Sequence, residues 1–205
     1  MHDLIVGIDP GLKGGVSILH RGTFFSASKM PVAAPLPGLA LGSRTIDVEA
    51  LLCLIPKDAV VVIESPQCRS HGLDVSTIAT AHLNFGVIIG ALQTKKVEVV
   101  IVPARTWTAW IHRFKAQGTE EKAATVSALL RLHPEAQKHV YGPRGGLLDG
   151  LSDACGIACW FAQDSGAYER WSTKHQSLTP RPELSVSTTH KKGPGFVLVD
   201  PLKLI

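Results

Sequence analysis

The N-terminal half of the chain alternates between apolar runs rich in valine, isoleucine and leucine and short segments rich in glycine, proline or polar residues. Residues 3–9, 14–22 and 23–30 are three such runs, and the last two meet at Arg21-Gly22, a pair typical of a tight turn. This spacing predicts an antiparallel meander of three short strands.

Two later runs, residues 58–66 and 97–103, are apolar with little interruption, which is typical of strands covered on both faces of a sheet. Helical patterns fill the segments between and after them. The expected helices are 46–56 with Asp47 near its start, 74–96, a short helix with a loop over 104–118, 119–134 with Thr119 as N-cap, and 147–163.

The resulting order, β-β-β-α-β-α-β-α-α, defines an α/β protein with a mixed sheet and helices on its faces. Residues 31–43 are rich in proline and glycine and are expected to form a loop. The periodicity ends near Gly166, so we expect one domain over residues 1–165 and an irregular, basic tail over 166–205. The last segment of this tail, "GFVLVDPLKLI", is a candidate docking strand.

Composition and charge limit the partners and the cellular location that fit this chain. The chain of 205 residues carries a formal net charge of +4 and has a pI of about 8.9, which suits a polyanionic partner. Its N-terminus does not resemble a signal peptide, and no apolar run reaches the length needed to cross a bilayer, so we expect a soluble cytoplasmic protein and no membrane partner. Cys155 and Cys159 fit reduced core thiols better than a disulfide or a zinc pair.

Acidic residues stand at isolated places in these apolar segments. Asp9 and Glu64 each end a predicted strand, while Asp149 and Asp153 are four residues apart and share one face of a predicted helix. Burying a carboxylate is costly unless it is paired or holds a metal. Carboxylate oxygens are the ligands that Mg²⁺ and Mn²⁺ prefer, and two such ions roughly 4 Å apart can assist hydrolysis of a phosphodiester.

Taken singly, three of these acids have ordinary explanations. Asp9 in "DPG" could be a turn residue, Glu64 a strand end at the surface, and Asp149 a helix N-cap. Asp153 is different because it lies inside the predicted helix. Strand ends and helix termini meet at one edge of an open α/β sheet, so the four acids together predict one metal site.

Four segments carry a family resemblance: "IVGIDPGLKGG", "VVVIESP", "HLNFGVIIGAL" and "LLDGLSDACGIACW". In this order they resemble the RuvC-type Holliday-junction resolvases, which have an RNase H-like fold, and the last segment resembles the variants found in phages and prophages. The resemblance covers roughly residues 3–163. It implies a mixed five-stranded sheet, with three antiparallel strands and two parallel ones, flanked by helices.

For the chemistry, the resemblance implies that Asp9, Glu64, Asp149 and Asp153 bind two Mg²⁺ ions, with Mn²⁺ able to substitute. The bound ions would activate water for hydrolysis of DNA and leave 5′-phosphate and 3′-hydroxyl ends. The segment "GTEEKAATV" resembles the family's segment in which a lysine meets the DNA, which implies that role for Lys122.

One departure from the family follows Pro103. The family often has a lysine there that helps at the scissile phosphate, whereas this chain has Trp107 and Thr108. Trp107 and Trp110 could stack on unpaired bases, although their spacing of three also suits core positions of a helix.

Branched DNA and a second copy of the chain are the implied partners. In the family two active sites of a homodimer nick opposite strands, and a helix like the long one expected here forms the interface. The candidate interface residues are His82, Phe85, Gly86, Ile89 and Gly90, the two glycines permitting close approach.

Lysine and arginine side chains supply most sequence-independent affinity for DNA, although any single one is as readily ordinary solvated surface. The candidate DNA contacts, including possible replacements for the missing lysine, are Arg69, His71, Arg105, Arg113, Lys115, Lys122 and Arg144.

The hypothesis with the most support is therefore a metal-dependent, structure-selective DNA endonuclease that cuts four-way junctions or other branched DNA. One alternative is a catalytically weak protein that only binds junctions. Another is a phosphotransferase of the actin-like kind, because "GIDPGLKGG" also resembles a phosphate loop of that group. That fold usually needs two such domains and a second glycine-rich motif, for which 205 residues leave little room.

Overall fold

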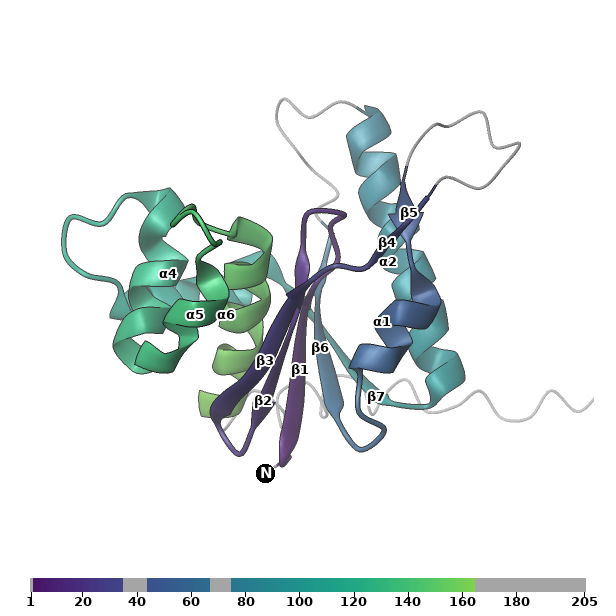
Figure 1. Ribbon diagram of the computed structural model, residues 1–205, viewed down its shortest axis with the longest axis horizontal. Coiled ribbons are helices and arrows are strands. Elements are labelled where there is room, and N and C mark those ends of the chain that lie inside the picture. The colour runs from purple at the N-terminus through teal and green to yellow at the C-terminus, as the bar shows by residue number, and fades with distance from the viewer. Residues whose placement is uncertain (1, 35–43, 67–74, 165–205) are drawn as a thin grey trace, which may run out of the picture.

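A computed structural model describes residues 2–34, 44–66 and 75–164 (Figure 1). Its central sheet has the strand order β3-β2-β1-β6-β7. The first three strands are antiparallel, whereas β1, β6 and β7 run parallel to one another. The mixed five-stranded sheet expected from the sequence is thereby confirmed. The strands are β1 (Leu4–Asp9), β2 (Gly15–His20), β3 (Thr23–Lys29), β6 (Val60–Ser65) and β7 (Glu98–Pro103).

Helices cover both faces of this sheet, with α1 and α2 on one side and α4, α5 and α6 on the other (Figure 1). The predicted helices are present, with bounds that differ by a few residues. They are α1 (Val48–Leu54), α2 (Val75–Lys95), α3 (Ala104–Ile111), α4 (Glu121–Leu132) and α6 (Asp149–Gln163). The structure adds the short helix α5 (Gln137–Val140), which the sequence did not predict, and 3-10 turns at His112–Phe114 and Pro134–Ala136.

Alternation along β1 builds two separate cores. Ile5 packs with the residues of α6 and its neighbours, while Val6 and Ile8 pack on the opposite face with α1 and α2. Successive side chains of a strand point to opposite faces, so the same rule places every second residue of β1 toward α6. This geometry decides where the acid at the end of β1 lies.

The turn between β2 and β3 is the tight turn that Arg21-Gly22 predicts. Arg21 and Gly22 both have positive φ angles, 50° and 79°, as the two central residues of a hairpin turn of type I′ require. The helix α1 likewise begins as predicted, because the Asp47 side chain accepts a hydrogen bond from the Ala50 amide at 3.0 Å.

Two local predictions are wrong. The first part of the expected loop pairs as a short ribbon, in which β4 (Val32–Ala33) is antiparallel to β5 (Thr45–Ile46), because burial of Ile46 and a hydrogen bond from Asp47 to Pro31 hold it to the domain. Thr119 is not the N-cap of α4, which is Glu120. The Thr119 hydroxyl instead donates to the Ala116 carbonyl at 2.7 Å, so the preceding turn uses it.

The helix α2 is more apolar than we expect from the sequence pattern. By length and composition alone it could cross a membrane, with a mean hydropathy of 1.6, which corrects the expectation that no such stretch exists. Only 22% of that stretch is buried in the domain. Its inner face packs against the sheet through Ile88, Ala91 and Leu92, as in a helix of a folded domain.

Candidate functional site

Asp9 and Glu64 lie on the face of the sheet that α6 covers. Asp9 is two residues after Gly7 in β1, and Glu64 is two residues after the buried Val62 in β6. Because β1 and β6 are parallel neighbours, their carboxyl ends meet at the same edge of the sheet, which is the upper edge in Figure 1. The strand pattern alone therefore brings these two carboxylates to one place.

The helix α6 crosses this face at close range because glycine and a hydroxyl permit it. A Cβ atom at Gly7 would lie 2.2 Å from the Ala154 carbonyl oxygen, so only glycine fits under the helix. On the next strand the buried Ser17 hydroxyl donates to that same oxygen at 2.7 Å. These contacts hold Asp153, the residue before Ala154, above the end of β1.

The first turn of α6 lies directly beside Asp9. A Cβ atom at Gly150 would lie 2.8 Å from Oδ2 of Asp9 and 2.3 Å from the Lys13 carbonyl oxygen. Asp149 and Asp153 flank this contact, the first exposed at the start of the helix and the second half-buried one turn later. The structure thus brings all four predicted acids to one edge of the sheet.

Burial and mutual repulsion perturb the acids. The pKa of Asp153 is raised to about 7, chiefly by burial and in addition by the charges of Asp9, Glu64 and Asp149. Burial also raises the pKa of Glu64 to about 7, with Asp9 adding to the rise. The pKa of Asp9 is raised by burial as well, against a hydrogen bond from the Gly11 amide that lowers it.

Trp107 is the site residue whose role the sequence did not reveal. Its indole Nε1 donates a hydrogen bond of 2.7 Å to Oε2 of Glu64, and this bond lowers the pKa of that carboxyl. The side chain is 2% exposed and packs in the core beside Gly156, where a Cβ atom would lie 2.8 Å from its ring. Trp107 is therefore a core residue with one polar function, the positioning of Glu64, and is not free to stack on a base.

The donor set matches a hard divalent cation in chemistry. The carboxylates provide only oxygen, and among the described residues none of Asp9, Glu64 or Asp153 forms an ion pair with a lysine, arginine or histidine. In that same part of the chain, no group of three or more His, Cys, Asp or Glu side chains is close enough together to hold a metal ion as it stands. Repulsion between like charges favours such a separation, and a divalent cation would draw the carboxylates together.

The candidate DNA contacts are spread more widely. Arg69 and His71 lie outside the described residues, and Lys122 lies in the first turn of α4. The side chains of Arg105, Arg113, Lys115 and Arg144 are exposed. Of these, Arg113 donates to the Trp110 carbonyl at 3.2 Å, and no described contact joins any of the four to the acids.

Three of the candidate interface residues, His82, Gly86 and Gly90, are exposed on the outer side of α2. His82 is exposed and its Nδ1 lies 2.9 Å from the Ile78 carbonyl oxygen. A Cβ atom at Gly86 or Gly90 would meet open space, whereas Phe85 and Ile89 are half-buried against the core of their own domain. Val75, Leu83 and Val87 expose 78%, 60% and 38% of their surface on this helix.

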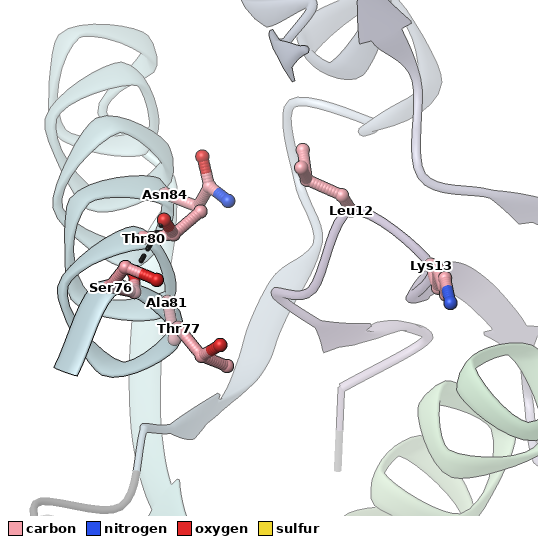
Figure 2. A pocket seen from close by; sticks show the side chains of 7 residues that line it. All are labelled: Leu12, Lys13, Ser76, Thr77, Thr80, Ala81 and Asn84. Carbon is pink, nitrogen blue, oxygen red and sulfur yellow. Dashed lines mark hydrogen bonds between the residues drawn. The ribbon is translucent and has the colours of Figure 1, made fainter. Parts of the chain in front are cut away.

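A cavity of about 360 Å³ lies between the β1–β2 turn and the first turns of α2 (Figure 2). Leu12 and Lys13 line it from the turn, and the hydroxyls of Ser76, Thr77 and Thr80 line it from the helix. Thr80 donates to the Ser76 carbonyl at 2.8 Å, so part of this polarity serves the helix itself.

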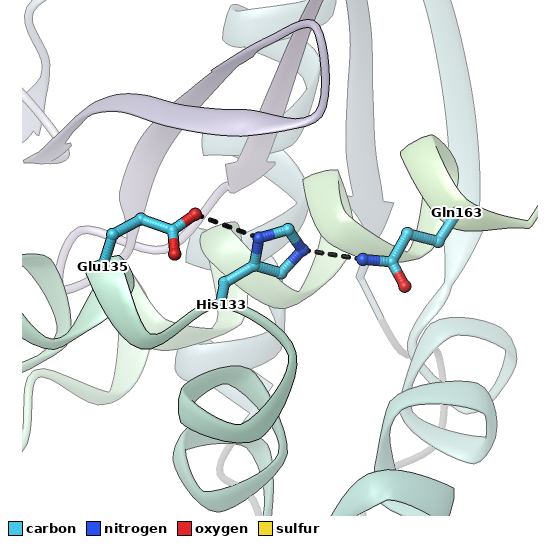
Figure 3. Close-up of polar contacts among 3 residues, drawn as sticks. All are labelled: His133, Glu135 and Gln163. Carbon is cyan, nitrogen blue, oxygen red and sulfur yellow. Dashed lines mark hydrogen bonds and ion pairs between the residues drawn. The ribbon is translucent and has the colours of Figure 1, made fainter.

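A second polar cluster lies at the other end of α6. Figure 3 shows the His133 imidazole between the Glu135 carboxylate and the Gln163 amide, with Nδ1 3.1 Å from Oε1 of Glu135 and Nε2 2.7 Å from the amide nitrogen. The Phe24 ring meets the imidazole edge-on at a centroid distance of 5.1 Å. Partial burial favours protonation of Glu135, but hydrogen bonds from its own amide and from His133 give it a lowered pKa.

No protein-family model and no curated protein matches the chain. Among solved structures, it is similar to T. thermophilus RuvC in complex with Holliday junction substrate, at 14% identity and a TM-score of 0.49 over 80% of this chain and 97% of that chain. It is also similar to a Thermus thermophilus RuvC structure, at 15% identity and a TM-score of 0.44 over 82% and 97%. At these values neither structure assigns a family or an activity to this chain.

Proposed function

We propose that this protein is a metal-dependent endonuclease that cuts branched DNA, with four-way junctions as its main substrate. The observation that carries the proposal is the convergence of Asp9, Glu64, Asp149 and Asp153 at one edge of the sheet. There burial, and then the charges of the other three acids, raise the pKa of Asp153 to about 7. A fold rarely gathers like charges in a half-buried place without a ligand that offsets them. The four sequence segments that resemble the RuvC-type resolvases give the same substrate class.

The four acids would hold two Mg²⁺ or Mn²⁺ ions, which supply an activated water and stabilise the charge that develops on the phosphate. Trp107 keeps Glu64 in one orientation and leaves its Oε1 for a ligand, since the indole engages only Oε2. Lys122 is placed at the start of α4, from which it would contact a DNA phosphate. The expected products carry 5′-phosphate and 3′-hydroxyl ends.

Cleavage of end-labelled synthetic DNA tests this function. A four-way junction, a flap and a linear duplex are each incubated with Mg²⁺, Mn²⁺ or EDTA. The Asp153→Asn variant removes one acid of the site, and Asp58→Asn is the matched control because Asp58 is exposed before the opposite end of β6. Paired nicks near the crossover that need metal, persist in the control and vanish with Asp153→Asn are expected.

Two other results would replace the proposal. Tight junction binding without any cleavage in either metal would make the protein a junction-binding protein. Release of phosphate from a nucleoside triphosphate, with no DNA cleavage, would favour the phosphotransferase alternative.

We propose further that the protein acts as a homodimer through the outer side of α2. Val75, Leu83 and Val87 expose apolar surface there, and Gly86 leaves room for a close approach. Such an exposed apolar helix is more often covered by a partner than left to water. A dimer would also place two acid sites on one junction, as cleavage of both strands requires.

Sedimentation of the Leu83→Asp variant tests the dimer. A charge in the middle of this surface is expected to give a monomer whose acid site still binds metal ions. Phe25→Asp is the matched control, since Phe25 is 70% exposed but lies on β3. A wild-type protein that is monomeric at all concentrations would overturn the dimer without affecting the acid site.

A further inference from the structure

Three cations surround a cavity next to the acid site. This cavity has a volume of about 420 Å³ and lies on the side of the β1–β2 turn that faces the start of α6. Lys13, Lys29 and Arg44 are the cationic residues of its wall, and Asp149 is part of the same wall. None of the three cations was among the DNA contacts predicted from the sequence.

The fold brings these cations together from three separate segments. Lys13 belongs to the β1–β2 turn, visible in Figure 2, and Lys29 ends β3, where it pairs with Gly15 at the start of β2. Arg44 directly precedes β5. A sequence separation of 31 residues between the first and the last hides this grouping from any linear reading.

The side chains of all three cations are exposed and available. In the part of the chain that the structure describes, the Lys/Arg ion pair is Arg21 with Asp3, so Lys13, Lys29 and Arg44 carry unneutralised charge. Cations that share one cavity repel one another, and an anion placed between them offsets that repulsion. Phosphate oxygens are the acceptors that lysine and arginine bind best.

We propose that Lys13, Lys29 and Arg44 form a binding site for a backbone phosphate of the DNA strand that enters the acid site; this inference rests on the proposed function. Two divalent cations would only neutralise the four carboxylates, so a DNA strand gains attraction from a nearby source of positive charge. Asp149 belongs both to the acid cluster and to the wall of this cavity, which makes the two sites continuous. A strand with one phosphate at the acids therefore places a neighbouring phosphate among the cations.

Salt-dependent binding of a four-way junction in Ca²⁺, measured without cleavage, tests this site. Each lost phosphate contact lowers the slope of log affinity against log salt by about one. The test variant combines Lys13→Gln, Lys29→Gln and Arg44→Gln, and the matched control removes the same charge at exposed positions outside both cavities through Lys57→Gln, Lys96→Gln and Lys138→Gln.

Because the three cations share one phosphate, the slope is expected to fall by about one in the test variant and to stay close to the wild-type slope in the control. A third variant, Lys13→Arg with Lys29→Arg and Arg44→Lys, keeps the charge and is expected to keep the slope. Circular dichroism melting establishes that each variant is folded before binding is compared.

The outcomes separate this site from the nuclease function. Equal slopes in the test and control variants, with a wild-type protein that binds and cuts junctions, would overturn the phosphate site and leave the function standing. Loss of slope in the charge-keeping variant would also overturn it, because shape and not charge would then explain the effect. A wild-type protein that binds no DNA would remove the function and this site together.

Discussion

The two ends of α6 hold polar clusters of opposite character. At its C-terminal end, His133, Glu135 and Gln163 complement one another, so that each imidazole nitrogen has a partner. At its N-terminal end, Asp149 and Asp153 lie beside Asp9 and Glu64. Burial raises the pKa of Glu64 and of Asp153 to about 7, and neighbouring carboxylates contribute to both shifts. Both clusters involve α6, but only in the first do the polar side chains complement one another through hydrogen bonds.

This difference separates a structural from a functional use of polar residues. A satisfied cluster ties elements together, here the end of α4 and the end of α6, and is worth a few kcal/mol. An unsatisfied cluster of like charges costs stability in the free protein and is retained where a ligand offsets the cost. The N-terminal cluster should therefore respond to metal and the C-terminal cluster should not.

The largest expected effect comes from Asp153→Asn. Cleavage of a four-way junction should fall by a factor of about 1,000 or more, because one oxygen ligand and its charge are lost. The same variant should melt at a higher temperature than wild type at pH 8 without metal, since a repelled, half-buried carboxylate is removed. Single-turnover cleavage and calorimetry measure the two effects, and loss of both activity and stability would count against a ligand site.

Replacing His133 should give the reverse result. His133→Ala leaves Glu135 and Gln163 without their partner and opens a gap beside Phe24, so the free energy of unfolding should drop by about 3 kcal/mol. The cleavage rate per folded molecule should stay within about twofold of wild type. Urea unfolding provides the first value, and a large loss of rate in fully folded variant would show that this cluster serves the reaction.

Much of this architecture could be predicted from the chain. The strands, the turn at Arg21-Gly22 and the cap at Asp47 depend on neighbouring residues, so local pattern is enough to find them. The grouping of Asp9 with Glu64 also followed from the sequence, because alternation and parallel order fix which strand ends meet.

Contacts between distant segments could not be predicted in this way. The bond from Trp107 to Glu64 joins residues 43 apart in the chain, so the sequence offers base stacking or a core position for the indole but does not indicate its polar role. The same holds for the pairing of Val32–Ala33 with Thr45–Ile46, where tertiary packing turned part of an expected loop into strands. Thr119 failed as a cap because a nearby carbonyl competes for its hydroxyl.

Stability of the metal-free protein should decrease as the pH rises from about 4 to 8. The pKa values of Asp153 and Glu64 are raised to about 7 in the folded protein, above their ordinary values of 3.8 and 4.5. The folded state therefore binds more protons than the unfolded state in this range, and the free energy of unfolding falls with pH by several kcal/mol in all. Melting curves at several pH values measure this slope.

Adding Mg²⁺ or Mn²⁺ at pH 8 should recover that stability, because binding to the folded state alone raises the free energy of unfolding. The double variant Asp153→Asn with Glu64→Gln should have a flatter pH profile and little response to metal. Asp58→Asn, at an exposed position, should behave as wild type. A pH slope unchanged in the double variant would show that other groups titrate.

The smallest expected effect tests how the core supports the acid site. Trp107→Phe keeps an aromatic ring in the core but removes the hydrogen bond of 2.7 Å to Glu64. Because that bond lowers the pKa of Glu64, its loss should move the pH dependence of cleavage upward, and the metal concentration for half-maximal rate should rise about tenfold. Cleavage rates over a grid of pH and Mg²⁺ concentration measure both shifts.

Trp110→Phe is the matched control for this test, because Trp110 packs against Phe114 at a centroid distance of 5.0 Å and contacts none of the acids through a described hydrogen bond. If both tryptophan variants shift the metal requirement equally, general loosening of α3 explains the effect. If only Trp107→Phe shifts the metal requirement, the hydrogen bond from the Trp107 indole to Glu64 couples the packed core to the acid site.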